Sequence, residues 1–334
     1  MPSQPEPAHR LHRRRSAVLA VAIIIALALV VIPARLLART HQQPPPSTRT
    51  PILLDTDIGT DIDDAFALAL ILRSPELNLL GVTTVSGNTE ARARLAAKML
   101  CEAEHCDIPV AAGKPGKSLP IEQTHWADNF SSSQLLSIHA ADFLAQQFDH
   151  KPGEITLIAI GPLTNVAALL QSDPKAAKEI HQIVMMGGSI ARGYDHHKAP
   201  EPEYNIDQDV AAARVVFSSG VPITMAPLDV TAMLDLDAKN RKRIFDAGTP
   251  LSKALAALYS LWGHPVPILF DPMAVAMLLK PGICTTKALD ITVDAKGFTR
   301  VVKEGKPNAV VGLHTDPAKF FHFYMSRVAP PANR

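Results

Sequence analysis

Apolar and polar positions alternate after residue 50 in two kinds of run. Short runs rich in β-branched residues are typical of buried strands, and longer runs with apolar residues at helical spacing are typical of helices. Strands are predicted at residues 52–55, 78–85, 155–160, 183–188 and 222–227. Helices are predicted between and after them, at residues 63–74, 89–103, 132–148, 164–171 and 209–220.

This alternation predicts an α/β fold, in which a Rossmann-like, mostly parallel sheet carries helices on both faces. Short extended segments beyond Lys280, at residues 287–294, 298–303 and 308–313, predict antiparallel additions near the C-terminus. Residues 317–328 predict a closing helix. Ligands of such folds bind beyond the carboxyl ends of the strands, and polar residues follow several predicted strands directly.

The richest polar segment follows the first predicted strand. Five carboxylates, from Asp55, Asp57, Asp61, Asp63 and Asp64, lie within ten positions. Helix capping explains one or two of them. Carboxylates crowded where a strand and a helix converge would repel one another, and their pKa values would rise, unless a cation neutralises them. The density therefore favours a site for a hard, oxygen-seeking ion, calcium before magnesium.

The N-terminus has a different pattern. A basic cluster at residues 9–15 precedes an unbroken apolar run at 17–34, whose length lies between a signal-peptide core and a spanning helix of roughly 20 residues. Residues 36–38 form a poor cleavage site, which favours a retained anchor over a cleaved signal peptide or a buried core helix. The predicted divisions are a basic region with signal anchor or signal peptide at 1–40, a proline-rich linker at 41–50 and one domain at 51–334.

A basic cluster followed by an apolar run predicts that the rest of the protein is exported, to the periplasm or another extracytoplasmic location. Contact with the inner membrane is expected through the N-terminal segment only. The formal net charge of +1 gives no reason to expect a nucleic-acid partner. Export also makes a local disulfide possible between Cys101 and Cys106, and two free thiols remain the alternative.

The segment DTDIGTDIDDAFAL at 55–68 resembles the hallmark DxDxGxDDAxAL block of the inosine–uridine-preferring nucleoside hydrolase family, with two extra residues before the paired aspartates. Later blocks of that family follow in order: VSGN at 85–88, IGPLTNVA at 160–167, VMMGGS at 184–189, EYNIDQDVAAA at 203–213, PLDVT at 227–231 and FDPMAVA at 270–276. The alternative for the first block alone is a haloacid-dehalogenase-type phosphatase, but the expected glycine after the second aspartate and the cap insertion are missing.

The resemblance implies a bound calcium ion. Its ligands would be Asp57, Asp64, Asp271 and the main-chain oxygen of Ile160. Asp57 would also act as general base towards a metal-bound water, which suits a carboxylate whose proton affinity the metal lowers.

Ribose recognition would fall, by the same resemblance, to Asp63, Asn88, Glu203 and Asn205. Each has a simpler alternative in the sequence. Asn88 could cap the helix that follows it, and Glu203 with Asn205 could form an exposed turn. Asp55 is expected to support the loop, and no role is assigned to Asp61.

Phe270 departs from the family pattern, because purine-accepting members carry a histidine there that is thought to protonate the leaving base. Phe270 could stack on the base instead. His125 and His264 are candidates for a replacement acid, and Trp262 is a candidate for stacking.

The implied reaction is hydrolysis of the N-glycosidic bond of a small-molecule nucleoside, giving ribose and free base. A calcium-dependent nucleoside- or sugar-binding protein without turnover is the alternative from another class. The resemblance also implies a homodimer or homotetramer, with no sequence feature to choose between them.

Overall fold

The computed structural model describes residues 49–117 and 120–330. Residues from Arg49 onward form a compact unit. The predicted basic region, the apolar segment and most of the linker lie outside the described residues. No helix within the described ranges combines the length and apolar character that crossing a bilayer requires.

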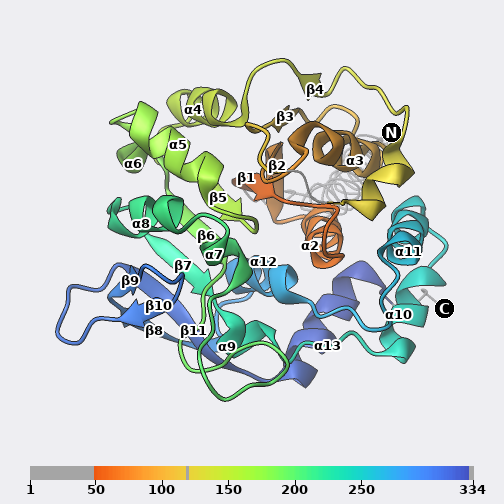
Figure 1. The fold of residues 1–334 in the computed structure, drawn as a ribbon. Helices are drawn as coiled ribbons and strands as arrows, with labels where there is room; N and C mark the ends of the chain where they lie inside the picture. The colour runs from red at the N-terminus through yellow and green to blue at the C-terminus, as the bar shows by residue number, and fades with distance from the viewer. Residues whose placement is uncertain (1–48, 118–119, 331–334) are drawn as a thin grey trace, which may run out of the picture. The chain divides into compact units, whose positions relative to one another are not determined.

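A nine-stranded sheet organises the described residues (Figure 1). Its strands, in spatial order, are β4 (Leu135–Leu136), β3 (Val110–Ala112), β2 (Leu77–Thr84), β1 (Thr50–Thr56), β5 (Thr156–Ala159), β6 (Gln182–Met186), β7 (Ile223–Ala226), β11 (Ala309–Thr315) and β8 (Cys284–Leu289). All neighbours pair in parallel except β11 with β8. A separate antiparallel ladder joins β9 (Ile291–Val293) to β10 (Thr299–Val301).

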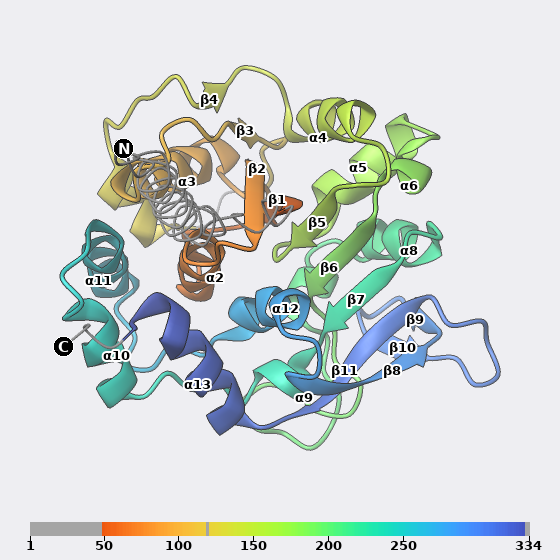
Figure 2. The same cartoon turned by 180° about the vertical axis from the view of Figure 1, so that it is seen from behind.

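Helices cover both faces of the sheet, as Figures 1 and 2 show. One face carries η1 (Glu122–Ala127), α2 (Asp63–Leu72), α3 (Thr89–Glu102), α9 (Leu228–Thr231), α10 (Ala238–Phe245), α11 (Pro250–Trp262), α12 (Phe270–Leu279) and α13 (Pro317–Val328). The other face carries α4 (Ala140–His150), α5 (Thr164–Ser172), α6 (Ala176–Glu179), α7 (Tyr204–Asp207) and α8 (Val210–Ser218).

Side chains of the central strands point alternately into two hydrophobic cores, one on each face of the sheet. In β1, Ile52 and Leu54 belong to one hydrophobic cluster, and Leu53 belongs to the other. Successive side chains of a strand point to opposite faces, so a strand buried on both sides is apolar throughout. The continuous apolar runs of the sequence therefore mark the centre of the sheet, and the predicted α/β class is confirmed.

The structure differs from the local predictions in three places. The segment predicted as a helix at residues 132–148 contains strand β4, and its helix begins only at Ala140. Strand β3 has three residues, which is too short to produce a periodic signal. Strand β11 is not wholly an antiparallel addition, because it pairs in parallel with β7 and antiparallel with β8. Local pattern does not encode the direction of a partner that is distant in sequence.

The order of the strands creates a switch point between β1 and β5. From β1 the chain adds β2, β3 and β4 on one side, and from β5 it adds β6 and β7 on the other. The connections after β1 and β5 therefore leave in opposite directions, which opens a crevice at the carboxyl ends of these two strands. Asp57 follows β1 at this crevice, and Gly161 follows β5.

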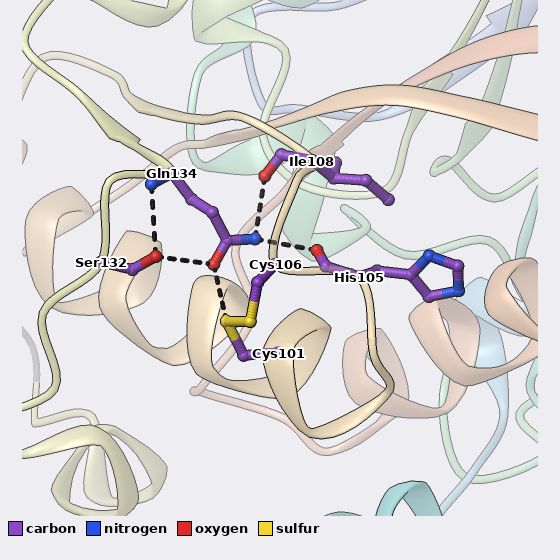
Figure 3. The surroundings of a disulfide bond; sticks show 6 residues. All are labelled: Cys101, His105, Cys106, Ile108, Ser132 and Gln134. Atoms are coloured by element: carbon purple, nitrogen blue, oxygen red, sulfur yellow. Dashed lines mark hydrogen bonds between the residues drawn. A yellow bond between two sulfur atoms is a disulfide. The ribbon is translucent and has the colours of Figure 1, made fainter.

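A disulfide joins Cys101 to Cys106 at the end of α3 (Figure 3), so the thiol alternative is wrong for this structure. The side-chain amide of Gln134, which lies in a different segment of the chain, also stabilises this turn. Its Nε2 donates to the carbonyl oxygens of His105 and Ile108, each at 3.0 Å. The covalent link and the two hydrogen bonds hold the turn that leads into β3.

Replacing both Cys101 and Cys106 by serine should lower the free energy of unfolding by about 2 kcal/mol, because the unfolded chain loses a short covalent loop. Chemical denaturation of the two proteins measures the difference. Cys284→Ser is the matched control, since Cys284 is an unpaired, buried thiol. An unchanged denaturation midpoint for the double variant would contradict the prediction.

Candidate functional site

A cavity of about 400 Å³ opens at the switch point. Nearly half of the residues that line it are acidic, and most of the others are aromatic or apolar. The acidic residues are Asp57, Asp61, Asp63, Asp64, Glu203, Asp207 and Asp271. No arginine, lysine or histidine is among the described residues that line it. The cavity is therefore suited to a cation and to a polyhydroxylated ligand.

Three buried carboxylates form the tightest group in the cavity. Asp63, Asp64 and Asp271 each offer an oxygen within 4.8 Å of the others. Asp63 and Asp64 begin α2, and Asp271 lies in the first turn of α12, where the helix dipoles favour negative charge. The amide of Asp271 donates to Asp63 Oδ2 at 3.2 Å. Two helix starts from distant parts of the chain thus assemble the cluster.

Helix capping does not account for this cluster. The residue at the start of α2 is Ile62, and no side chain caps that helix. Asp61 Oδ1 accepts from the amide of Ile62, at 2.6 Å, which precedes the first residue of the helix. The number of aspartates at the start of α2 is therefore not explained by helix capping.

Asp57 lies beside the cluster at the end of β1. The hydroxyl of the preceding Thr56 donates to Asp64 Oδ1, which ties the strand to α2. Gly161 leaves room for the Asp57 carboxylate, since a β-carbon at position 161 would lie 2.9 Å from both the amide nitrogen and Oδ1 of Asp57. Any larger residue at this position would push the carboxylate aside.

Burial controls the protonation of these groups in the metal-free protein. Desolvation raises the pKa of Asp57 to about 6, against a weaker opposing effect of the Arg92 charge. Desolvation, followed by repulsion from neighbouring carboxylates, raises the pKa values of Asp63, Asp64 and Asp271 well above the ordinary range. The site therefore holds protons that a bound cation would displace.

Asn205 reaches the carbonyl expected to be a metal ligand. Its Nδ2 donates to the oxygen of Ile160 at 3.1 Å and to that of Met186 at 3.2 Å. The main chain at the ends of β5 and β6 is thereby joined. Ile160 lines the cavity together with Asn205, as the resemblance implies for a shared site.

Glu203 is buried and held by three amides. Its carboxylate accepts from Gly188 at 2.9 Å, Asn205 at 3.0 Å and Ile206 at 3.3 Å. Desolvation still raises its pKa to about 7, because it outweighs these bonds. The alternative of an exposed turn is wrong for both Glu203 and Asn205, since both are buried against the cavity.

Two other aspartates hold the loops around the cavity. Asp55 Oδ1 accepts from the Thr83 hydroxyl at 2.6 Å and from Asn165 Nδ2 at 2.8 Å. Asp229 accepts from the amides of Ile190 and Ala191, at 2.8 and 2.9 Å. Asp55 is thus placed to support the β1 loop, and Asp229 the loop that follows β6.

The residues expected near a leaving base lie in two places, the cavity itself and a hollow next to it. Phe270 lines the cavity, and its ring packs edge-on against Tyr194 at 5.9 Å between centroids. Trp262 and His264 lie in an adjacent hollow, which shares Thr60 and Asp61 with the cavity.

Two expected residues lie away from the cavity lining. The side chain of His125 is 63% exposed, and its Nδ1 lies 3.1 Å from Asp128 Oδ2. Asn88 is exposed, and its side chain caps α3 by accepting from the amide of Ala91 at 3.1 Å. The simpler capping role of Asn88 is therefore present in the structure.

Sequence reasoning missed several side chains of this region, among them Arg92, Tyr194 and Tyr204. Arg92 precedes Leu95 by three positions and Met99 by seven, so it lies on the apolar face of α3, where a charged residue is a detectable anomaly. Tyr194 lies in a loop without periodicity, and nothing local marks it. Tyr204 lies inside the EYNID block, in which roles were assigned only to its neighbours Glu203 and Asn205.

The fold and the cavity together define an α/β protein with an acidic, cation-binding type of site at its switch point. Residues 52–322 match the family model described as "Inosine-uridine preferring nucleoside hydrolase". The chain belongs to this family, and it is an enzyme of the nucleoside hydrolase class. The phosphatase alternative is therefore wrong.

Curated relatives support this assignment. The chain is 34% identical over 309 residues to a "Pyrimidine-specific ribonucleoside hydrolase RihA" of Salmonella paratyphi B, covering 83% of this chain and 98% of the relative. It is also 34% identical over 310 residues to the protein of the same name from Citrobacter koseri, covering 84% of this chain and 98% of the relative.

Solved structures show the same fold. A "Plant nucleoside hydrolase - PpNRh1 enzyme" matches with a TM-score of 0.74 and 26% identity, over 84% of this chain and 99% of that one. A "Purine-Preferring Ribonucleoside Hydrolase from Gardnerella vaginalis" matches with a TM-score of 0.71 and 27% identity, over 84% and 98%.

The raised pKa values predict an unusual pH dependence of stability. Asp57 has a folded pKa of about 6 against an ordinary 3.8, so the metal-free folded protein binds more protons than the unfolded chain between these values. This stabilising contribution is complete below pH 3.8 and is lost as the pH rises through about 6. Metal-free protein should therefore melt roughly 5 °C higher near pH 5 than near pH 7.5.

A cation bound by these carboxylates would reverse this trend, because it would replace the protons and stabilise the charged side chains. Thermal unfolding at both pH values, with a chelator and with excess calcium, tests both statements. A calcium-induced increase in Tm that is larger near pH 5 than near pH 7.5 would contradict them.

Proposed function

We propose that this protein is a calcium-dependent ribonucleoside hydrolase that uses Asp57 as its general base. The observation that carries the proposal is the group of buried carboxylates around one cavity at the switch point. None of Asp57, Asp63, Asp64 and Asp271 forms an ion pair with a basic side chain in the described parts of the chain. Buried charges without such partners require another neutralising group.

The donor set fits a hard cation. Asp57, Asp64, Asp271 and the carbonyl of Ile160 supply only oxygen atoms, which calcium prefers over nitrogen or sulfur ligands. Asp63 belongs to the same tight group of oxygens, so we assign it to the edge between the ion and the ribose. When bound, calcium would lower the pKa of a coordinated water and so supply a nucleophile at neutral pH.

The remaining polar side chains are proposed to hold the ribose. Glu203 and Asn205 are fixed by the hydrogen bonds given above. Both Nδ2 hydrogens of Asn205 are used in those bonds, so the oxygens of the two side chains are the groups proposed to accept from the ribose hydroxyls. Asp57 is proposed to accept a proton from the attacking water. Negative charge around the cavity also favours the positive charge that develops on the ribosyl group in an oxocarbenium-like transition state.

The base is proposed to lie against Phe270 and Tyr194. An edge-on aromatic pair offers a face for a flat heterocycle. Trp262 and His264 border the adjacent hollow and are available to the outer edge of the base. The curated relatives are named as pyrimidine-specific, which supports testing uridine and cytidine beside inosine.

We also propose that the domain from residue 51 acts outside the cytoplasm, behind the basic and apolar N-terminal segment. The sequence pattern of that segment supports this proposal. A nucleoside hydrolase in that compartment would release ribose and base for uptake. A homodimer or homotetramer stays a prediction from the family resemblance.

The direct test is ribose release from uridine, cytidine and inosine by the full chain. Activity should disappear in excess chelator and return when calcium is added in excess, whereas magnesium should restore less. Full activity in chelator-treated, metal-free protein would refute calcium dependence. Calcium binding without ribose release from any nucleoside would favour a binding protein instead.

Asp57→Asn should lower kcat by about 100-fold or more, because the amide cannot accept the proton. It should leave the metal-free protein at least as stable as the parent, since a buried carboxylate with a raised pKa is replaced by a neutral isostere. Asp55→Asn is the matched control, because it changes a buried carboxylate within β1 that does not line the cavity. Steady-state kinetics and thermal unfolding separate the two effects, and an Asp57→Asn enzyme with parental kcat would exclude the base role.

A further inference from the structure

Arg92 is a completely buried charged residue behind the candidate site. It projects from the first turn of α3, and its relative exposure is 0%. A guanidinium is costly to bury unless its donors find partners. Within the described residues it forms no ion pair with a carboxylate, so the reason for its burial lies in the other groups that it contacts.

Those groups are main-chain oxygens and one hydroxyl from two loops. Nη1 donates to the carbonyl oxygens of Asp57 and Ile58, the latter at 3.0 Å. Nη2 donates to Thr60 Oγ1 at 2.7 Å. Nε donates to the carbonyl oxygen of Ser86 at 2.9 Å. One planar fork therefore holds the loop that follows β1 and the loop that follows β2.

We propose that Arg92 is a positioning residue for nucleoside hydrolysis, which fixes the main chain at 57–60 and thereby the direction of the Asp57 carboxylate. The inference rests on the proposed role of Asp57 as base and calcium ligand. Two consecutive carbonyls of the loop accept from the guanidinium, so the main-chain segment that carries the Asp57 side chain is held in place. The Ile58 amide is fixed as well, because it donates to Thr56 Oγ1 at 3.2 Å.

The second loop depends on the same side chain. Ser86 has a φ of 70° and Gly87 a φ of 60°, a left-handed pair that is unfavourable for serine. The bond from Arg92 Nε to the Ser86 carbonyl holds this turn. Asn88 follows directly and caps α3, so the start of that helix is held by the same contact.

Lysine cannot reproduce the arrangement. Its three donors radiate from one nitrogen, whereas the guanidinium presents donors along a rigid fork to acceptors on different loops. Arg92→Lys therefore keeps the charge and removes the geometry. A displacement of about 1 Å in a catalytic group can cost roughly 100-fold in rate.

The experiment compares the full-length parent with Arg92→Lys. We expect kcat on the best nucleoside substrate to fall by about 10- to 100-fold, while KM changes much less. We also expect weaker calcium binding to the metal-free protein by isothermal titration calorimetry. Thermal unfolding of each protein reports whether stability changes in parallel.

Arg214→Lys is the matched control. Arg214 Nε also donates to a main-chain carbonyl, that of Val293 at 2.8 Å, but it lies on α8 against β9. Its kcat and calcium affinity should equal those of the parent even if its Tm falls. Thr60→Val removes the hydroxyl that accepts from Nη2, at an exposed position that also borders the cavity. It should lower kcat by a few-fold without affecting folding.

Arg92→Lys with parental kcat and calcium affinity would overturn the proposal, whatever its stability. If Arg92→Lys does not fold, an unchanged kcat in Thr60→Val would overturn it. For Arg92→Ala, partial recovery of kcat on adding guanidinium at a non-denaturing concentration would support it. A parent that needs no calcium would instead refute the proposed function, so the two failures are distinguishable.

Discussion

Mutual repulsion among buried carboxylates is the constraint around which this structure is organised. Asp57, Asp63, Asp64 and Asp271 meet at the carboxyl ends of parallel strands, away from water and without basic side chains in the cavity lining. Such a group is unfavourable in a folded protein unless protons or a cation neutralise it. The surrounding scaffold must therefore hold these side chains together against their own repulsion.

Several parts of the fold meet this requirement. The first turns of α2 and α12 place partial positive charge at Asp63, Asp64 and Asp271. Further from the cluster, the main chain is fixed by buried hydrogen bonds, from Thr83 and Asn165 to Asp55 and from three amides to Glu203. Rigid support of this kind gives a functional site its defined geometry.

The cavity lining combines two kinds of chemistry. Its buried carboxylates are suited to an ion and vicinal hydroxyls, whereas Phe270 and Tyr194 add an aromatic surface. The family histidine is replaced by Phe270, and no other histidine is among the described lining residues. Departure of the base therefore depends on groups other than the one that purine-accepting relatives use at this position.

The sequence by itself determined the α/β class, the alternation of the central strands with helices, and the acidic block at the end of β1. These features are local, because periodicity and clustered charge are properties of neighbouring residues. The ordered blocks also identified the family and most of the residues that line the cavity. Tertiary structure decided which of the remaining candidates meet there. Tertiary contacts pair β11 in parallel with β7 and bury Glu203. They also leave His125 exposed and place the Arg92 guanidinium between two loops. Each depends on contacts between segments far apart in the chain, which local patterns do not encode.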